Sequence, residues 1–337
     1  MSEESAPRVV RLGVKDIVFP SSELSQIEDS SSYLSLDDGG ESLRRVFSRD
    51  GFVYLRGALG RGNVLSAREA VIEHLSTKGG VFKEGAPGVL LDACGLGCLP
   101  MIEGRNGVTH DPRVAGVLEG EPLKGAVGKL LALPPESLRT FDYKWLRAMP
   151  RKVFTGVHCD SVYMSRGSPN LLTCWIPFEE AATLELGALA LYKGSHRATG
   201  GLKKLRETYG AMDTESEPGF VGSGWLTDNP NDVTSLDSEK SQDQQRGWVS
   251  GDFSAGDVII FGMHTLHMST ANLTDNVRIS CDVRWQSAGE PIDERYTGSE
   301  GELREKQLAR KAGGAWATGK GEGDEVTMQD LRKRWGL

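Results

Sequence analysis

The stretch that decides the fold is VIIFGMHTLHMSTANLTDNVRISCDVRW, residues 258 to 285. It begins and ends with short apolar, β-branched segments, VIIF and VRISCDVRW, which are typical of buried strands. Between these segments lie His264, His267, Ser269 and Asn272, followed by the turn-forming residues LTDN. Short strands separated by turn signals predict a β-sandwich or barrel.

The same character extends towards the N-terminus. The segments FDYKWLRAM, VFTGVHCD, LLTCWIPF and ALALYKG are short, β-prone and separated by turn-forming residues. Before them, apolar side chains recur at helical spacing in ESLRRVFSRDG and in residues 63–77, and a further helix is expected over residues 113–133. Helices followed by a run of strands predict one α+β, mainly β domain rather than a doubly wound sheet.

Three parts are expected along the chain. Residues 1–40 are polar and rich in Ser and Asp, and we predict a flexible leader there. Residues 41–290 are expected to form a single domain. Residues 291–337 are charged and Gly-rich and are expected to be an extension that ends in a short helix, where Thr327 and Asp330 have the spacing of a capping box.

Two segments interrupt the regular pattern of the central part. Residues 79–110 are Gly-rich and have no clear period, and a loop of this length is usually functional. Residues 203–251 are polar and acidic, and we interpret them as an insertion between strands because strand-like sequence resumes after them. Our hypothesis is that the two segments form a lid over a substrate.

The composition is that of an ordinary soluble globular protein. The 337 residues include 39 Lys and Arg against 47 Asp and Glu, a formal net charge of −8. An acidic chain without a basic stripe argues against nucleic acid as the main partner. Five cysteines without repeating spacing do not suggest a disulfide framework. Without a membrane-spanning apolar segment or the apolar core of a signal peptide, we expect a cytoplasmic protein with no membrane partner; the oligomeric state is open.

One of the six histidines, His158, precedes Asp160 by two residues. On an extended strand, residues two apart point to the same face, so an imidazole and a carboxylate can reach one ion. With a second histidine from a distant strand they would form a facial triad, which leaves three coordination positions open. The His-x-Asp pattern alone is also compatible with a hydrogen-bonded surface pair.

The distal block is more specific. His267, Ser269, Asn272 and Arg278 follow the pattern His-x-Ser-x-x-Asn with an Arg eleven residues after the histidine. Here the sequence resembles the phytanoyl-CoA dioxygenase family of iron(II)- and 2-oxoglutarate-dependent oxygenases. FSRDGFVYLRGAL is similar to that family's N-terminal helix and strand, and TCWIPFEEAATLELGALALYKGSHR to its middle block, so that the resemblance covers about residues 47 to 285. It implies a double-stranded β-helix (jelly-roll, cupin-like) core flanked by N-terminal helices.

The resemblance also implies the metal ligands. His158, Asp160 and His267 are expected to bind iron(II), with 2-oxoglutarate and O2 as co-substrates and succinate and CO2 as co-products. His264 stands three residues before His267, so on a strand the two face opposite ways unless a bulge intervenes. The spacing selects His267 as the ligand. For His196, in the block Gly-Ser-His, hydrogen bonding is expected rather than ligation.

The co-substrate residues follow in the same way. Arg278 is expected to pair with the distal carboxylate of 2-oxoglutarate, because guanidinium and carboxylate form two parallel hydrogen bonds. Ser269 has the same strand parity as His267 and can add a hydroxyl. Trp175 and Thr173 are further candidates to line the co-substrate pocket, and a plain core role is the alternative for Trp175.

The expected function is oxidation, most directly hydroxylation, of an aliphatic C–H bond in a small molecule. Halogenases of this superfamily have a small residue in place of the carboxylate, so Asp160 favours a reaction without halide. The alternatives are a non-catalytic metal-binding jelly-roll or cupin-like sensing protein, a zinc hydrolase with the same ligands, and an oxygenase acting on a protein side chain. The substrate is open among acyl-CoA, amino-acid-like solutes and natural products.

Overall fold

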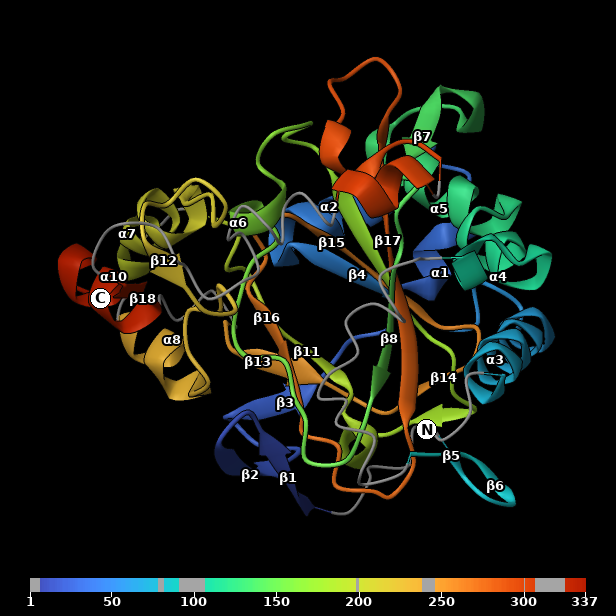
Figure 1. Cartoon of the computed structure of the whole chain (residues 1–337). Helices are drawn as coiled ribbons and strands as arrows, with labels where there is room; N and C mark the ends of the chain where they lie inside the picture. Colours follow the sequence, from blue (N-terminus) through green and yellow to red (C-terminus); the bar gives the residue numbers. More distant parts are fainter. Residues whose placement is uncertain are drawn as a thin grey trace.

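Two β-sheets that pack against each other form the centre of a mixed α and β fold (Figure 1). The computed structural model describes residues 7–77, 82–90, 107–197, 200–237, 246–299, 301–306 and 325–337. Among these residues, no helix has the length and apolar character needed to cross a membrane.

The larger sheet has the strand order β4 (Phe52–Leu55), β15 (Val258–Gly262), β9 (Leu172–Pro177), β17 (Arg278–Ser287) and β7 (Leu138–Thr140), with β8 (Trp145–Met149) also paired to β17. The smaller sheet has the order β16 (His267–Ser269), β11 (Leu189–Tyr192), β13 (Trp248–Ser250) and β3 (Leu24–Gln26). Two-stranded pairs are formed by β1 (Arg8–Leu12) with β2 (Lys15–Phe19), β5 (Phe82–Lys83) with β6 (Ala86–Leu90), β10 (Ala181–Ala182) with β14 (Phe253–Ser254), and β12 (Phe220–Val221) with β18 (Val326–Thr327).

The helices are α1 (Ser31–Leu34), α2 (Glu41–Asp50), α3 (Arg61–Ser76), α4 (Pro112–Leu118), α5 (Glu121–Leu131), α6 (Ser161–Met164), α7 (Gly200–Glu207), α8 (Pro230–Leu236) and α10 (Met328–Trp335). Short 3-10 turns cover Gly107–His110, Pro135–Ser137, Leu184–Leu186, Tyr209–Ala211 and Glu294–Tyr296. Helices α3, α4 and α5 lie together on one side of the larger sheet (Figure 1).

The two faces of the larger sheet bury different sets of side chains, because successive strand residues point to opposite faces. On the inner face, Trp175 and Phe261 pack with Met268 of the smaller sheet. On the outer face, Ile260 packs in one cluster with residues of the helices, such as Val64. Inward-pointing side chains of the larger sheet are therefore enclosed between the two sheets, where a site can be kept away from bulk water.

Most of the predicted helices and strands are present. Helix α2 and strand β4 follow the prediction, and Gly51 ends the helix with a left-handed φ of 89°. The single helix expected over residues 113–133 is wrong, since the structure has α4 and α5 with a break at Gly120. The reason is Pro122, which has no N–H to continue the hydrogen bonding of the preceding helix but is accepted in the first turn of a new one.

The prediction of a flexible leader is corrected by the structure. Within residues 1–40, strands β1, β2 and β3 are formed, and β3 pairs in parallel with β13 of the smaller sheet. Leu12, Phe19 and Leu24 are fully or almost fully buried. In these short strands apolar residues alternate with polar ones, and many Ser and Asp residues surround them. The prediction relied on the average composition of residues 1–40, which does not reveal strands that pack on the core.

The segment at residues 203–251 is folded where the structure describes it. It contains α8 and β12, but its last residues form β13, so one strand of the smaller sheet lies inside the predicted insertion. Its strand β12 pairs in parallel with β18 near the C-terminus. The predicted terminal helix is confirmed as α10, with the capping box of Thr327 and Asp330. The other half of the lid hypothesis, residues 79–110, lies largely outside the described residues.

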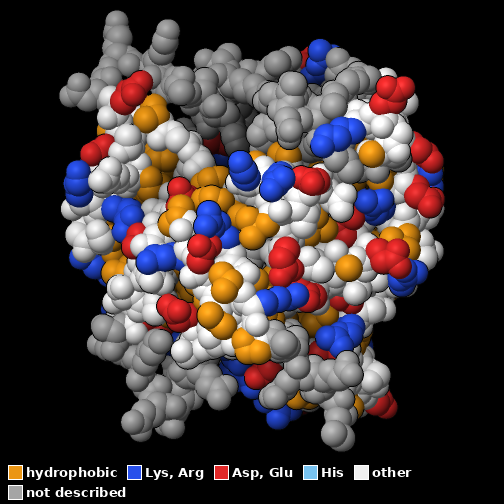
Figure 2. Space-filling model, turned by 90° about the horizontal axis from the view of Figure 1, so that it is seen from below, with side chains coloured by type: hydrophobic (Ala, Val, Ile, Leu, Met, Phe, Trp, Pro, Cys, Tyr) orange, Lys and Arg blue, Asp and Glu red, His pale blue; other side chains and the backbone are white. Residues whose placement is uncertain are grey.

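The face seen from below in Figure 1 carries a mixture of side chains (Figure 2). Basic and acidic groups are interspersed there, and apolar side chains lie among them. The β1–β2 pair contributes the exposed Val9, Val14 and Val18 to the surface.

Candidate metal centre

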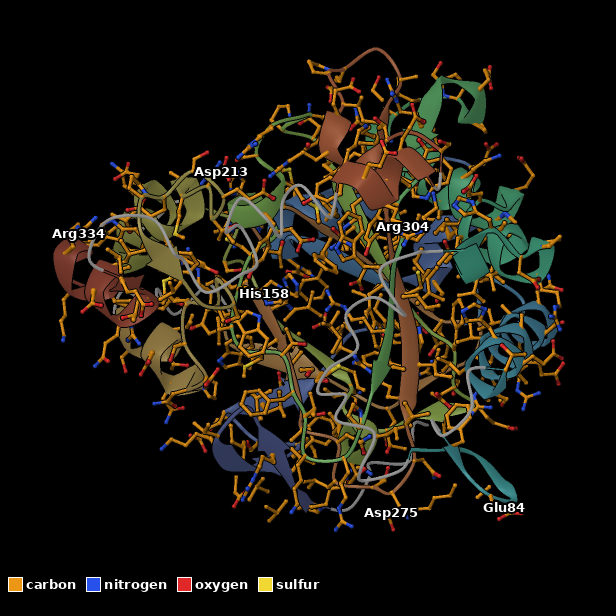
Figure 3. The ribbon with its side chains drawn as sticks, viewed as in Figure 1. Glu84, His158, Asp213, Asp275, Arg304 and Arg334 are labelled. Carbon is orange, nitrogen blue, oxygen red and sulfur yellow. The ribbon has the colours of Figure 1, made fainter. Side chains whose placement is uncertain are left out.

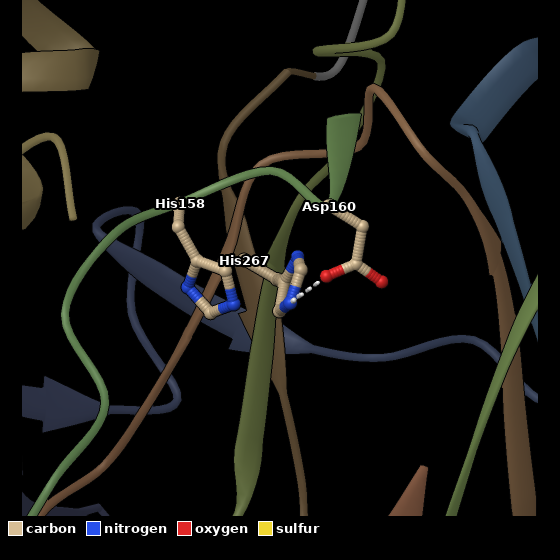
Figure 4. A group of neighbouring side chains, drawn as sticks. All are labelled: His158, Asp160 and His267. Carbon is tan, nitrogen blue, oxygen red and sulfur yellow. Dashed lines mark ion pairs between the residues drawn. The ribbon is translucent and has the colours of Figure 1, made fainter. Parts of the chain in front are cut away.

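Three predicted residues, His158, Asp160 and His267, come together between the sheets (Figure 3, Figure 4). One potential ligand atom from each lies within 4.8 Å of the others. All three residues are buried, with exposed fractions of 5%, 2% and 5%. In Figure 3, His158 lies inside the molecule whereas Asp275 and Arg334 lie at its periphery. The low exposure separates this cluster from an ordinary surface group of acidic and basic residues.

The backbone brings the ligands together in a way that differs from the prediction. The segment VFTGVHCD is not a regular strand: Val157 and His158 form isolated bridges, and Asp160 is the N-cap of helix α6 with helical φ and ψ of −68° and −21°. Strand parity therefore does not explain why His158 and Asp160 converge. The chain turns into α6 after His158, and this turn directs the carboxylate to the imidazole.

Each histidine is oriented by a hydrogen bond to the backbone carbonyl of the residue two positions before it. Nδ1 of His158 is 2.9 Å from the carbonyl oxygen of Gly156, and Nδ1 of His267 is 3.0 Å from that of Thr265. A carbonyl oxygen only accepts, so Nδ1 must carry the hydrogen in both rings. The lone pair of each Nε2 is then free to bind a metal, the arrangement by which metal-binding histidines are generally held.

The charge states also suit a metal. Burial lowers the pKa of His158 well below its ordinary value, and proximity to His267 lowers it further. Burial likewise lowers the pKa of His267. For Asp160 burial alone would raise the pKa, but Arg284 and the two histidines outweigh burial and lower it. Two neutral imidazoles and one carboxylate are the forms that coordinate a divalent cation.

The carboxylate of Asp160 is held by two hydrogen bonds to one of its oxygen atoms. Its Oδ2 atom accepts a hydrogen bond of 2.5 Å from the Thr173 hydroxyl and one of 3.1 Å from the Arg284 guanidinium. Its Oδ1 atom lies 3.8 Å from Nε2 of His267, the pair marked in Figure 4. Thr173, expected to line the co-substrate pocket, therefore contacts the carboxylate ligand instead.

The cluster opens onto a cavity that also contains the predicted co-substrate residues. Trp175, Ser269 and Arg278 line the same cavity as His158 and His267. Arg278 is 2% exposed, and its Nη1 donates a 2.6 Å hydrogen bond to the carbonyl of Gly187. The structure therefore joins the distal block to the two histidines of the cluster in one cavity.

The positions of Ser269 and Trp175 agree with roles in the walls of this cavity. Ser269 lies on β16 with His267, and its Oγ accepts a 2.9 Å hydrogen bond from the Thr155 backbone. The guanidinium of Arg278 lies 5.9 Å from the centre of the Trp175 ring. Trp175 is also 2% exposed and packs edge to face on Phe253, so it is both a core residue and a cavity residue.

Asn272, His264 and His196 lie outside the metal cluster. Asn272 donates to the carbonyl oxygens of Met149 and Asn276, which ties the turn before β17 to strand β8. His264 lies before β16 and lines a separate cavity, so His267 is confirmed as the histidine of the cluster. His196 has Nε2 3.0 Å from the carbonyl oxygen of Ser48, the hydrogen-bonding role that the sequence predicted.

Sequence reasoning missed three charged residues near the cluster. Arg284 contacts Asp160, while Arg147 and Asp282 line the cavity and form a 3.0 Å ion pair. A signal for two of them was present: Arg278, Asp282 and Arg284 share the parity of one strand. Charged residues on the inner face of an otherwise apolar strand indicate a site.

The donor set fits an iron(II) ion. Two imidazole nitrogens and one carboxylate oxygen that can reach one ion form the 2-His-1-carboxylate triad, which leaves other coordination positions open for further ligands. A buried arginine that lines the same cavity as the two histidines matches a bidentate co-substrate with a second, distal carboxylate.

Comparisons with known proteins agree with this geometry. The family model described as phytanoyl-CoA dioxygenase (PhyH) matches residues 124–280, which include the three clustered residues and Arg278. A search of curated proteins finds no match.

Solved structures share the fold at low sequence identity. The chain is similar to EctD from S. alaskensis in its apoform (TM-score 0.52, 14% identity, 88% of this chain and 89% of that chain). It is also similar to the carbocyclase SnoK from nogalamycin biosynthesis (0.50, 17%, 82% and 93%). A third similar structure is the epimerase SnoN in complex with Fe3+, alpha ketoglutarate and nogalamycin RO (0.50, 18%, 77% and 86%). At these identities the likeness concerns the fold.

The family match and the clustered triad define an iron- and 2-oxoglutarate-dependent oxygenase. The central part of the chain, residues 124–280, matches the model of the phytanoyl-CoA dioxygenase family. Iron and 2-oxoglutarate are accordingly its metal and co-substrate.

Proposed function

We propose that the protein hydroxylates an aliphatic C–H bond of a small molecule, with iron(II) held by His158, Asp160 and His267. The observation that carries this proposal is the shared cavity: the two histidines that cluster with Asp160 and the buried Arg278 line the same cavity. Bound iron would supply the activation of O2 that is coupled to oxidative decarboxylation of 2-oxoglutarate.

The protein's own residues position the reactants. Arg278 and Ser269 would bind the distal carboxylate of 2-oxoglutarate, and the carbonyl of Gly187 holds the guanidinium in place. Because this arginine is buried, its attraction for a carboxylate is little screened by water. Trp175 would form a flat wall beside the carbon chain of the co-substrate, and the sheets around the cavity limit access of water to the reacting atoms.

The architecture supports a finer assignment of fold. We infer that the two facing sheets are a double-stranded β-helix, with β8, β9, β15 and β17 in one layer and β11, β13 and β16 in the other. The division into a domain at residues 41–290 and an extension at residues 291–337 is part of the same proposal. The N-terminal strands would then be an addition to the smaller sheet.

The reaction outcome and the substrate can be tested together. The iron-loaded protein would be screened with acyl-CoA esters, amino-acid-like solutes and natural products for stimulated release of succinate. For a stimulating compound, labelled O2 would show whether one oxygen atom enters the product. Incorporation of labelled oxygen supports hydroxylation. An epimerised or cyclised product without new oxygen would contradict hydroxylation and indicate a reaction of the kind for which SnoN and SnoK are named. Tight iron binding without turnover of any compound would favour a sensing role.

A further inference from the structure

We propose that Arg284 is a positioning residue that, together with Thr173, restricts Asp160 to binding iron through one oxygen atom. The inference rests on the proposed function, since it concerns the carboxylate ligand of that iron. Arg284 is not part of the His-x-Asp or His-x-Ser-x-x-Asn patterns, and it acts through Asp160 rather than on the reactants.

The two carboxylate oxygens of Asp160 have different partners. Oδ2 of Asp160 accepts hydrogen bonds from Thr173 at 2.5 Å and from Arg284 at 3.1 Å. Oδ1 is directed to the other ligands and lies 3.8 Å from Nε2 of His267. Two donors on the same oxygen occupy the directions in which it could approach a metal, so Oδ1 is left as the ligand atom.

A carboxylate that binds through one oxygen atom leaves more coordination positions of the metal free. An octahedral iron(II) ion held by three protein ligands would have three positions left, and a bidentate 2-oxoglutarate together with O2 would need all three. If Asp160 bound through both oxygens, it would occupy one of these positions. Hydrogen bonds that hold Oδ2 away from the metal therefore preserve the space for both co-substrates.

The side chain of Arg284 is itself buried and held by contacts on several sides. Its side chain is 2% exposed, and its guanidinium lies 4.0 Å from the centre of the Trp145 ring. Its Nη1 atom lies 3.8 Å from Oδ2 of Asp282 on the same strand face. An arginine fixed on an aromatic ring and beside a second carboxylate can hold Asp160 in one orientation without being drawn to the metal site.

The test is anaerobic binding of 2-oxoglutarate to the iron(II)-loaded protein. The readout is the visible charge-transfer absorption of a 2-oxo acid chelated to iron(II), and Arg284→Gln, Arg284→Lys and Thr173→Val would be compared with wild type. Loss of a group that orients a metal ligand typically weakens binding by 10- to 100-fold. We therefore expect about 10-fold or greater weakening of 2-oxoglutarate binding in Arg284→Gln, with Arg284→Lys between it and wild type and a smaller loss in Thr173→Val.

Arg246→Gln is the matched control. Arg246 is 4% exposed in its side chain and pairs with Asp237 at 2.9 Å, but neither residue lines the metal cavity. Thermal unfolding of Arg246→Gln and Arg284→Gln then measures the effect of losing a buried ion pair, while only Arg284→Gln should weaken 2-oxoglutarate binding. If Arg284→Gln does not fold, Arg284→Lys and Thr173→Val carry the test.

The outcomes separate the two proposals. Weakened co-substrate binding, or loss of iron uptake in folded Arg284→Gln, supports the positioning role. Unchanged absorption and affinity in the Arg284 and Thr173 variants would overturn it while leaving the proposed function intact. Absence of the absorption in the iron-loaded wild type would instead overturn the proposed function.

Discussion

His158 and His267 pair through their backbones: the N–H group of each donates to the carbonyl oxygen of the other, at 2.9 and 2.8 Å. Their ring centres lie 4.0 Å apart. The two residues come from distant parts of the sequence, so this antiparallel bridge sets the distance between the two imidazoles. The metal centre is therefore a product of the fold rather than of one local motif, and mutations that test it must separate ligation from strand pairing.

The choice between the two neighbouring histidines can be tested directly. His267→Ala removes a proposed ligand, whereas His264→Ala alters a residue that lines a separate cavity. We expect His267→Ala to lower 2-oxoglutarate turnover by at least about 100-fold, more than typical losses of groups that only orient ligands. His264→Ala should keep iron binding and turnover within a few-fold of wild type. Equal losses in the two variants would contradict the assignment.

Arg278 should control affinity for the co-substrate. Loss of one partner of a buried charge pair costs about 2–5 kcal/mol, which corresponds to a rise in KM for 2-oxoglutarate of roughly 30-fold or more in Arg278→Ala. Arg151→Ala is the control, because Arg151 is exposed and pairs with Asp275 at the surface. Steady-state kinetics with varied 2-oxoglutarate measures both. An unchanged KM in Arg278→Ala would show that the distal carboxylate binds elsewhere.

Gly187 supports Arg278 through its carbonyl group, and its backbone has a left-handed φ of 97°. An alanine there would be strained, so Gly187→Ala should lower the free energy of unfolding by about 1–3 kcal/mol and weaken 2-oxoglutarate binding. Gly125→Ala, within helix α5, has open space for a methyl group and should stabilise the protein by up to about 1 kcal/mol. Chemical denaturation of both variants measures the difference; equal effects would contradict a special role for the Gly187 backbone.

The metal-free protein should lose stability in mildly acidic solution. Burial holds the pKa values of His158 and His267 below the ordinary 6.5. Between the folded and unfolded pKa values the unfolded state binds more protons, so the free energy of unfolding falls as pH decreases below about 6.5, by up to about 1.4 kcal/mol per pH unit for each histidine. Denaturation from pH 7 to pH 5 measures this. A double His158→Gln, His267→Gln variant with the same pH dependence would assign the effect to other groups.

Much of the site could be predicted from the sequence because the residues of each motif lie close together in the chain, at fixed spacings. The block from His267 to Arg278 spans two strands that follow one another in the sequence, β16 and β17, and residue parity within β16 places Ser269 on the same face as His267. The contact of Thr173 with Asp160 was not predicted, since parity gives the face of a strand but not the partner across the cavity. Arg284 was missed because its partner Asp160 is distant in sequence and is oriented by helix α6, which the β-prone segment did not indicate.

In the fold, too, the features that depend on contacts between distant parts of the chain could not be predicted. Segments with a clear period, such as α2 and β17, could be predicted, whereas β1 to β3 could not, because their stability comes from Leu12 and Leu24 packing on the sheet rather than from composition. The lid hypothesis for residues 79–110 and 203–251 stays a prediction. Limited proteolysis with and without ligand would test it, and equal protection in both states would contradict it.

The most direct test of the account is anaerobic titration of the iron(II)-loaded protein with 2-oxoglutarate, followed by the charge-transfer absorption of the chelate. We predict a saturable absorption in wild type and His264→Ala, its loss in His267→Ala, and a strongly reduced affinity in Arg278→Ala. A wild-type protein that is saturated with iron(II) and shows no binding of 2-oxoglutarate would contradict the account.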